Sequence, residues 1–369
     1  EAIARAIDMD RAVIEERLMG DFSPDPDWLD RLKAPVTQDE LDAKPLPFLL
    51  ANPMSESEIS ALNPTDVLVE YKWDGIRAQL IKTHETIRLW SRGDQDITEQ
   101  FPDIVEVATT LPSQIILDGE ILAGTVEHLQ TFNDLQTRLN RKRITQTLLK
   151  THPAFFKAYD LLRLDGEDLR GHPLIARKAA LSKIAVSQSL TIDPMCSETI
   201  HTMRQEARRK GAEGVMIKGK QSCYVGGRKA GHWWKWKLDP MTADCVLIYA
   251  QAGHGRRASL HSDYTLACWN QDNELVPVAK AYSGLTDAEI KDMDQWIRKH
   301  TLQKFGPVRQ VEAFQVFEIG FEGIARSTRH KSGIALRFPR ILRWRQDVGP
   351  KDADHLTHFE ALMSDAHAV

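Results

Sequence analysis

Lys72 is the residue of this sequence whose surroundings most suggest chemistry. It lies in the window Glu70-Tyr-Lys-Trp-Asp-Gly75, at the end of the apolar, strand-like run 67–71, and a glycine turn follows it closely. A lysine amine is a poor nucleophile at its usual pKa of about 10.4, so burial or nearby cations must lower that pKa before the amine can attack phosphorus. Taken alone, the window is equally compatible with a solvated lysine paired with Asp74.

Other polar residues follow strand-like runs in the same way. Lys235 and Lys237 alternate with tryptophans in the run 232–237, so we expect both ammonium groups on one face of a strand and the indoles on the other. The remaining windows are Ser91-Arg-Gly93, Leu117-Asp-Gly-Glu120, Ala158-Tyr-Asp160, Glu213-Gly-Val-Met-Ile-Lys218 and Leu336-Arg-Phe-Pro-Arg-Ile-Leu-Arg-Trp-Arg-Gln-Asp347. Together these windows bring carboxylates, cations and one aromatic residue to the ends of strands.

The elements that would position these residues form a mixed α/β pattern, which ends near Leu238. Its strand-like runs are 67–71, 78–81, 87–91, 115–117 and 155–159. Its helical patterns are 101–111, 131–139, 173–185 and 197–210.

A strand-rich pattern follows, with runs at 244–249, 264–269, 275–281 and 315–320. One helix is predicted at 286–300, opened by Thr286 and Glu289 as a capping box. Short strands with a single helix suit a small Greek-key barrel such as an OB-fold.

Composition and charge limit the class of protein. The chain has 369 residues, of which 42% are hydrophobic and 27% charged, as in ordinary globular proteins, and no apolar run is long enough to span a bilayer. Its four cysteines lie more than twenty residues apart without a Cys-x-x-Cys pair, which excludes the usual zinc finger. The net charge of −4 hides a basic stretch, 320–345, in which seven Arg and Lys residues stand against one Glu and could contact a phosphate backbone.

In their order along the chain, these windows resemble the nucleotidyltransferase motifs of the ATP-dependent DNA ligases, and most of all the bacterial enzymes of archaeal and eukaryotic replicative type. The resemblance runs from about Pro45 to Asp347. It implies an α+β fold in which an ATP-grasp-like nucleotidyltransferase (adenylation) domain, 45–238, precedes an OB-fold β-barrel domain with a C-terminal tail, 239–369. Residues 1–44 resemble the end of that family's DNA-binding domain, so they are expected to form a short helical N-terminal remnant.

The resemblance implies a catalytic residue and its helpers. Lys72 would attack the α-phosphorus of ATP, forming lysyl-AMP and releasing pyrophosphate. The AMP would then pass to the 5′-phosphate of a DNA nick, where the 3′-hydroxyl would displace it. Lys235 and Lys237 would contact the α-phosphate and, with Arg77, lower the pKa of Lys72.

Two carboxylates are expected to bind the metal cofactor, Mg²⁺ or Mn²⁺. Mg²⁺ typically takes one or two carboxylates together with phosphate oxygens and water. Because acidic neighbours would raise the pKa of Lys72, Glu120 and Glu213 are predicted to be metal ligands and not direct partners of the nucleophile. Glu120 also belongs to the expected nucleotide site, and surface salt bridges are the alternative for both residues.

Further nucleotide contacts follow from the resemblance. Glu70 matches the position that accepts a hydrogen bond from the adenine amino group, Tyr159 matches the aromatic that stacks on the base, and Met216 would line the opposite face. In isolation, Tyr159 and Met216 would more often be plain core residues. Ribose or phosphate contacts are expected for Arg77 and Arg92. Arg228 and Lys229 both occupy the approximate position of another basic contact, and Lys229 is taken as the candidate.

The last motif of the family closes over ATP and is matched by Arg337, Arg343, Arg345 and Asp347. That motif commonly ends in Asp-Lys, but Val348 follows Asp347 here. This departure is expected to affect the efficiency of the first step more than that of the later two.

Basic residues elsewhere are expected to hold DNA phosphates without reading sequence. The candidates are Arg138, Arg141, Arg143, Arg256, Arg257 and Arg326. A solvated helix face is the alternative for any one cluster. The implied partner is nicked double-stranded DNA and not a membrane, and the protein is expected to be a monomer in the cytoplasm, at the bacterial nucleoid.

Other functions remain open. An RNA ligase or a GTP-using capping enzyme would share the lysine motif and the barrel, but Glu70 and the C-terminal domain favour the DNA enzyme. An NAD-dependent ligase is disfavoured because the cysteine tetrad of those enzymes is missing. A non-catalytic nucleic-acid clamp would not need the complete set of Lys72, Glu120, Glu213, Lys235 and Lys237.

Overall fold

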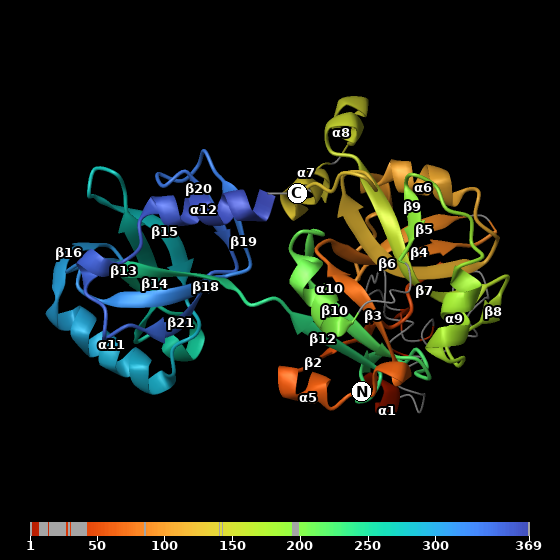
Figure 1. Ribbon diagram of the computed structural model, residues 1–369, viewed down its shortest axis with the longest axis horizontal. Helices are drawn as coiled ribbons and strands as arrows, with labels where there is room; N and C mark the ends of the chain where they lie inside the picture. The colour runs from red at the N-terminus through yellow and green to blue at the C-terminus, as the bar shows by residue number, and fades with distance from the viewer. Residues whose placement is uncertain are drawn as a thin grey trace. The chain divides into compact units, whose positions relative to one another are not determined.

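The chain divides into two compact units, Glu1–Leu238 and Asp239–Val369 (Figure 1). The computed structural model describes residues 2–6, 14, 27, 28, 30, 43–84, 86–139, 141, 143–193 and 199–367. Each unit has a hydrophobic core of its own. Apart from the short helix α1 (Ala2–Ala6), most of the helical pattern predicted for residues 1–44 lies outside the described residues.

The first sheet of the N-terminal unit carries Glu120 and Tyr159 on its two longest strands. It has six strands in the order β5-β4-β6-β7-β8, all antiparallel, with β9 joined in parallel to β7. The strands are β4 (Ile76–Lys82), β5 (Ile87–Ser91), β6 (Ile115–Ala123), β7 (Ala154–Leu164), β8 (Glu167–Asp168) and β9 (Leu190–Ile192). Helices α6 (Pro102–Ala108) and α7 (Phe132–Leu139) cover one face, where Ile104 and Leu135 are buried with Leu117.

The second sheet has four strands, and two of them carry the predicted lysines Lys72, Lys235 and Lys237. Its order is β2-β12-β10-β3, and β10 pairs antiparallel with both β3 and β12. The strands are β2 (Asn52–Pro53), β3 (Val67–Trp73), β10 (Ala212–Gly219) and β12 (Trp233–Lys237). Helix α10 (Ile200–Ala207) lies against β10 and β3 and buries Ile200 and Met203 on one face of the sheet (Figure 1).

A shared core joins the two sheets. Tyr159 and Ile116 of the first sheet are buried together with Trp233 of the second, and Met216 packs against them. The smaller elements of this unit are β1 (Leu49–Leu50), α5 (Glu56–Ser60), η1 (Pro64–Asp66), η2 (Thr98–Gln100), α8 (Gln146–Thr151), α9 (Leu174–Leu181) and β11 (Gly227–Arg228). The predicted base-binding residues Tyr159 and Met216 therefore lie where the two sheets pack against each other.

The C-terminal unit is built on one seven-stranded antiparallel sheet. Its order is β15-β14-β13-β17-β16, and β18 joins β13 to β21. The strands are β13 (Met241–Ala252), β14 (His261–Trp269), β15 (Leu275–Ala281), β16 (Thr301–Phe305), β17 (Val308–Val311), β18 (Val316–Phe321) and β21 (Arg340–Trp344). A hairpin of β19 (Gly323–Arg326) and β20 (Ile334–Arg337) and the turns η3 (Gly255–Arg257) and η4 (Pro350–Asp352) complete it.

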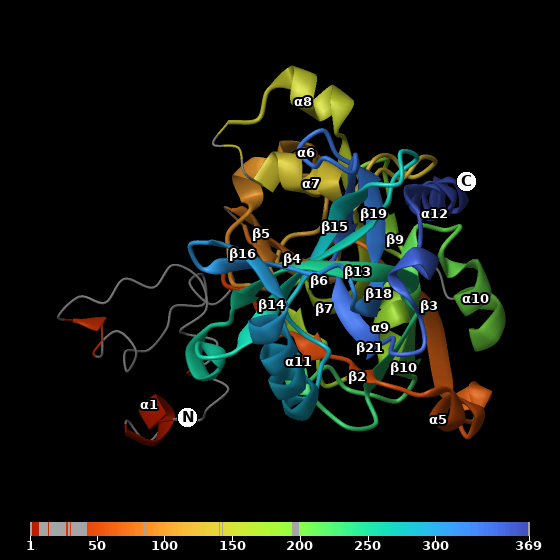
Figure 2. The same cartoon turned by 90° about the vertical axis from the view of Figure 1, so that its left-hand side faces the viewer.

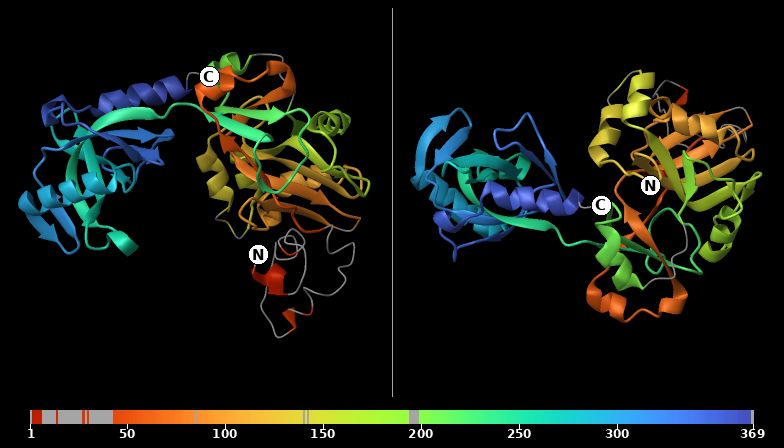
Figure 3. Two further views of the ribbon diagram at one scale, coloured as in Figure 1. Left: turned by 90° about the horizontal axis from the view of Figure 1, so that it is seen from below. Right: turned by 45° about the horizontal axis from the view of Figure 1, so that its top comes forward.

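Two helices cover this sheet. Helix α11 (Asp287–Lys299) packs on β14 (Figure 2) and opens with the predicted capping box, in which Thr286 accepts from the amide of Glu289 and the Glu289 side chain accepts from that of Thr286. Helix α12 (Leu356–His367), in a segment predicted to be a tail, lies against β13 and β19 (Figure 3). It buries Phe359 and Met363 in the same core.

The helices predicted at 101–111, 131–139, 173–185 and 286–300 correspond to α6, α7, α9 and α11, each somewhat shorter than predicted. The helix predicted at 197–210 corresponds to α10. The structure describes this predicted range from Thr199 onward. Among the described residues, no helix has both the length and the apolar character needed to cross a bilayer.

Candidate active site

Lys72 lies near the end of β3 and is paired with a carboxylate from the neighbouring strand. Its Nζ donates to Glu213 Oε2 at 2.9 Å, and Lys237 Nζ lies 3.1 Å from the same oxygen. The expectation that Glu213 is not a direct partner of the nucleophile is therefore wrong in this structure. The reason is the pairing of β3 with β10, in which Ala212 stands opposite Trp73 and brings Glu213 beside Lys72.

The two lysines hold Glu213 in its charged form. Burial alone would raise the pKa of its carboxyl, but the charges and hydrogen bonds of Lys72 and Lys237 outweigh burial and hold the pKa at about 2. Glu213 is therefore a permanent anion at neutral pH.

A glycine allows the strand of Glu213 to lie close to the strand of Lys235 and Lys237. The register of β10 against β3 shifts between Ala212 and Val215, so Glu213 and Gly214 lie in an irregular stretch of the strand. Gly214 has φ +146°, and a Cβ atom there would lie 2.3 Å from the carbonyl oxygen of Trp236 on β12. Only glycine fits this close approach of two main chains.

Lys235 and Lys237 occupy one face of β12, as predicted, but the indoles do not all occupy the other. Lys235 is opposite Met216 in the register of β12 and β10. Trp234 and Trp236 pack on the α10 side, whereas Trp233 is buried in the shared core with Tyr159. The prediction was wrong for Trp233 because side chains two apart on a strand share a face, and this residue stands two before Lys235.

The charges around Lys235 form a cationic cluster. Burial lowers the pKa of its ammonium, and the charges of Arg228, Lys72, Lys237 and Arg92 lower it further. Arg92, predicted as a nucleotide contact, thus acts on this site. Of the neighbouring pair Arg228 and Lys229, the charge of Arg228 lowers the pKa of Lys235, and the carbonyl of Lys229 accepts a hydrogen bond from the Asn52 side chain at 3.1 Å.

Glu120 is a second carboxylate at this site. Its environment raises its pKa, whereas that of Glu213 lowers it. It stands opposite Arg77 in the pairing of β6 with β4. Burial raises the pKa of Glu120 to about 8, and the charges of Glu213 and Asp118 add to the rise, while those of Lys72 and Arg77 oppose it. Without a further cation this side chain is mainly protonated at neutral pH.

These two carboxylates fit a magnesium ion that also binds phosphate. Among the described residues, no group of three or more His, Cys, Asp or Glu side chains could hold a metal on its own. Mg²⁺ usually needs only one or two carboxylates when phosphate oxygens and water supply the other ligands. Glu213 is close enough to Glu120 to raise its pKa, and a bound cation would favour the ionised form of Glu120.

The predicted base-binding residues are together in the shared core. Tyr159 and Trp233 meet edge to face with ring centroids 6.1 Å apart, and Met216 packs in the same cluster. Glu70 stands opposite Met216 across β3 and β10. The carboxylate of Glu70 is buried and ion-paired with two lysines, Lys178 at 2.6 Å and Lys218.

Arg77 is bound on several sides within its own unit. Its Nε and Nη2 donate to the carboxylate of Asp118 at 3.2 and 2.7 Å, and its Nη1 donates to the carbonyl of Leu49 at 2.7 Å. Its guanidinium also lies over the rings of Phe48 and Trp233. Most of its N–H groups are therefore engaged.

Arg138, predicted to contact DNA, is a core residue. Its side chain is fully buried; Nη1 and Nη2 donate to Asp103 at 2.9 and 2.6 Å, and Nε donates to the carbonyl of Gln100. It also lies over the ring of Phe101. The prediction for Arg138 is therefore wrong, because α7 turns this residue toward α6 and away from solvent.

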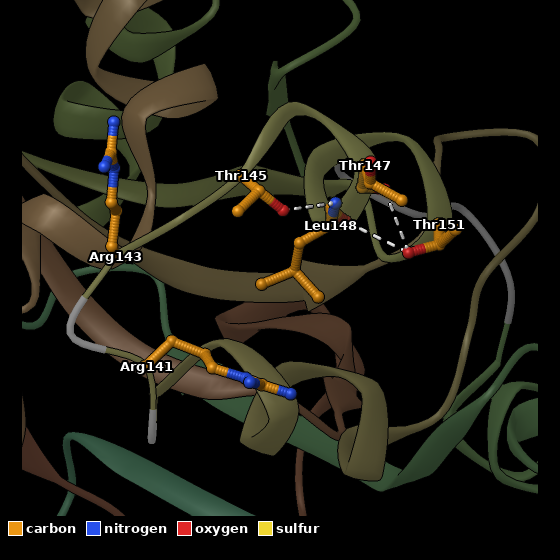
Figure 4. A pocket seen from close by; sticks show the side chains of 6 residues that line it. All are labelled: Arg141, Arg143, Thr145, Thr147, Leu148 and Thr151. Carbon is orange, nitrogen blue, oxygen red and sulfur yellow. Dashed lines mark hydrogen bonds between the residues drawn. The ribbon is translucent and has the colours of Figure 1, made fainter.

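Arg141 and Arg143 are exposed and border a small polar pocket next to α8. The pocket has a volume of about 190 Å³ and is lined by Arg141, Arg143, Thr145, Thr147, Leu148 and Thr151. The two arginine side chains lie apart from each other (Figure 4). The Thr145 hydroxyl accepts from the Leu148 amide, so it serves as a helix cap.

The other predicted basic contacts lie in the C-terminal unit. Arg256 and Arg326 are exposed, and Arg257 pairs with Asp287 at 2.8 Å.

The residues of the last motif are in the same unit. Arg343 pairs with Glu318 at 3.2 Å, Arg337 lies over the ring of Phe338, and Arg345 bridges Asp244 and Asp347. Val348 packs against a small apolar cluster of this unit, so an apolar residue is accommodated at the position where a lysine was expected.

Comparisons with known proteins agree with this arrangement. The family model described as ATP dependent DNA ligase domain matches residues 48–237, and that of the ATP dependent DNA ligase C terminal region matches residues 257–348. A probable DNA ligase of Koribacter versatilis is 36% identical over 346 residues, which are 86% of this chain and 60% of that protein. A DNA ligase of Methanococcoides burtonii is 30% identical over 334 residues, 88% of this chain and 58% of that protein. The chain thus spans less than two thirds of the length of these relatives.

Solved structures show the same fold. A Lig E DNA ligase superposes with a TM-score of 0.55 at 17% identity, over 81% of this chain and 99% of that one.

Proposed function

Because the chain belongs to the family of ATP-dependent DNA ligases, we propose that it seals nicks in duplex DNA through a covalent AMP adduct on Lys72. The observation that carries the proposal is the hydrogen bond of 2.9 Å between Lys72 Nζ and Glu213, beside the cationic strand of Lys235 and Lys237. The ion pair with Glu213 fixes the direction of the Lys72 nitrogen, and the cationic side chains beside it suit a site that binds phosphate.

In the first step, the amine of Lys72 loses a proton and attacks the α-phosphorus of ATP. A phosphorus–nitrogen bond forms, the bond to the bridging oxygen breaks, and pyrophosphate leaves. Because the pKa of Glu213 is held at about 2, its carboxylate is a weak base. Glu213 therefore orients the amine, and the proton passes to water or to a phosphate oxygen.

The cationic cluster stabilises the charge that develops on the phosphates. Catalysis of phosphoryl transfer depends on positioning and on neutralising charge. Arg92, Lys72 and Lys237 supply positive charge around Lys235. Glu120 and Glu213 would hold Mg²⁺, which when bound acts as a Lewis acid on phosphate oxygens.

The base of ATP is proposed to bind between Tyr159 and Met216, with Glu70 accepting a hydrogen bond from the 6-amino group of adenine. This part of the proposal is supported by the common packing of Tyr159 and Met216 and by the cross-strand pairing of Met216 with Glu70. Arg77, bound to Asp118, would support the floor of this site.

In the later steps, AMP passes from Lys72 to the 5′-phosphate of the nick, and the 3′-hydroxyl then attacks that phosphate and releases AMP. The exposed arginines of both units, Arg141, Arg143, Arg256 and Arg326, are proposed to bind the duplex through its phosphates. We further propose that the protein works as a monomer on nicked duplex DNA in the bacterial nucleoid.

The test of the proposal is covalent labelling with ATP radiolabelled at the α-phosphate, in the presence of Mg²⁺. The unmodified protein should acquire a label that is stable to alkali and lost in acid, as a phosphoramidate is. Lys72→Ala should acquire none and should still seal part of a DNA substrate whose nick already carries AMP. A matched control, Lys291→Ala, replaces an exposed lysine of the C-terminal unit and should label normally.

Two results would contradict the proposal. One is the absence of any adduct on the unmodified, folded protein. The other is an acid-labile adduct of normal yield on Lys72→Ala, which would move the nucleophile to another residue.

A further inference from the structure

A buried cluster of charges lies next to the proposed base site and has no part in the phosphate chemistry. Glu70, Lys178 and Lys218 are each almost fully buried, and the two lysines bind different oxygens of the Glu70 carboxylate. We propose that Lys178, together with Lys218, is a positioning residue for base selection, because it fixes the Glu70 carboxylate as a hydrogen-bond acceptor for a 6-aminopurine nucleotide. This inference rests on the function proposed above.

Lys178 connects three parts of the base site at one point. It comes from α9, outside the two sheets, and its Nζ donates to Glu70 Oε1 at 2.6 Å and to the carbonyl of Asp193 at 2.9 Å. The carbonyl of Tyr159 is a weaker third acceptor at 3.5 Å. One ammonium group thus holds both the proposed acceptor and the main chain of the proposed stacking residue.

Lys218 approaches Glu70 from the side of the aromatic rings. Its Nζ binds Glu70 Oε2 and lies over the rings of Tyr159 and Trp233, 4.3 and 4.0 Å from their centroids. With a lysine on each oxygen, the Glu70 carboxylate cannot rotate without losing a partner. Each carboxylate oxygen still has a second lone pair with which to accept another hydrogen bond.

Stability alone does not account for such a cluster. A buried ion pair gains little over well-packed apolar residues, because removing the charges from water costs about as much as their attraction returns. The two ammonium groups outweigh burial and hold the pKa of Glu70 below its usual value. The carboxyl therefore stays ionised and can only accept hydrogen bonds.

An acceptor that cannot donate distinguishes the two purines. Adenine carries an amino donor at C6, whereas guanine carries a carbonyl oxygen, which would face the carboxylate with no proton between them. A buried polar group left without a partner is costly, so a site of this kind rejects the wrong base strongly. Without Lys178 the carboxyl would be held by one lysine, would be free to turn, and would take up a proton more readily.

The test compares ATP with GTP. For the unmodified chain and for Lys178→Met, kcat/KM of adduct formation on Lys72 is measured with each nucleotide, and the ratio of the two values is the readout. Lys178→Met should lower the ATP-to-GTP ratio about 10- to 100-fold, the range expected for one hydrogen bond to a charged group. Lys183→Met, an exposed neighbour beyond the same helix, should leave the ratio unchanged.

Binding gives a readout that does not need the covalent step. In a Lys72→Ala background, which cannot form the adduct, calorimetry should give the same loss of preference for ATP over GTP when Lys178→Met is added. Circular dichroism and thermal unfolding verify that each variant is folded.

A second variant covers the case in which Lys178→Met fails to fold. Glu70→Gln removes the buried negative charge, so Glu70→Gln with Lys178→Met leaves fewer unpaired charges than Lys178→Met alone. Since the amide of glutamine can donate as well as accept, Glu70→Gln should already lower the ratio, and adding Lys178→Met should lower it little further.

The outcomes separate the inference from the function on which it rests. If the unmodified chain forms no adduct with ATP, the proposed function fails. If it does, but Lys178→Met keeps the full ATP-to-GTP ratio, the inference is wrong. It is also wrong if Lys178→Met changes the ratio equally with Glu70 and with Gln at position 70, because Lys178 would then not act through Glu70.

Discussion

Glu120 and Glu213 are two carboxylates at one site whose pKa values are driven in opposite directions. Two lysines hold that of Glu213 at about 2, while burial raises that of Glu120 to about 8. Carboxyl groups with such separated pKa values have different chemical roles. Glu213 is the fixed anion that orients Lys72, and Glu120 is the group whose charge depends on whether a cation is present.

This difference predicts a proton release when Mg²⁺ binds with nucleotide. At a pKa of about 8, most Glu120 side chains carry a proton at pH 7, and a metal ligand must lose it. Isothermal titration calorimetry at pH 7 in buffers of different ionisation enthalpy should show the release of a proton. Glu120→Gln should remove this release, and an unchanged release in that variant would exclude Glu120 as a ligand.

The same carboxyl predicts how stability depends on pH. The folded-state pKa of Glu120, about 8, lies above its usual value of 4.5, so the folded protein holds an extra proton between these values. The contribution of Glu120 to the free energy of unfolding should therefore fall as the pH rises from about 4.5 to about 8. Glu120→Gln should reduce this fall in urea titrations at several pH values, and an identical pH profile would contradict the raised pKa.

Arg138 links helix α7 to helix α6 and to nearby main chain. It comes from α7 and binds Asp103 of α6, the carbonyl of Gln100 and the carbonyl of His152. Arg138→Met leaves Asp103 without its cation, so it should lower the free energy of unfolding by on the order of 3 kcal/mol. Urea denaturation measures this loss.

An exposed arginine nearby provides the control. Arg143→Met should change the free energy of unfolding by less than about 0.5 kcal/mol, as surface substitutions usually do. A neutral effect of Arg138→Met on stability, together with weaker DNA binding, would restore its predicted role as a DNA contact.

Elements were predictable from the sequence where the signal was local. The capping box of Thr286 and Glu289, the apolar run before Lys72 and the spacing of Lys235 and Lys237 are patterns of adjacent residues, and each has its expected element. Arg138 was misjudged and Lys178 was missed because their environment depends on residues far away in the sequence. Both are basic residues on helices, which usually face solvent, and their partners, Asp103 and Glu70, stand 35 and 108 residues away along the chain. No periodicity in the sequence reports such pairs.

The whole molecule presents exposed arginines on both of its units, and this predicts how the proposed DNA binding responds to salt. Each phosphate that a cation neutralises steepens the fall of affinity with salt by about one unit on a log–log plot. Arg143→Gln in one unit and Arg326→Gln in the other should each reduce the slope by about one, measured by fluorescence anisotropy on a nicked duplex. Arg88→Gln, which replaces an exposed arginine paired with Asp96, is the control and should leave the slope unchanged. A slope near zero for the unmodified chain would contradict binding through phosphates.

Gly214 restricts how this site can change. Its main chain lies so near that of Trp236 that even a methyl group would force the two strands apart, and those strands carry Glu213 on one side and Lys235 and Lys237 on the other. The spacing between the strand of Glu213 and the strand of Lys237 is consequently set by the backbone atoms of Gly214 and Trp236. A protein engineer could retune the reactivity of Lys72 by exchanging what surrounds it, but could not do so by widening the gap.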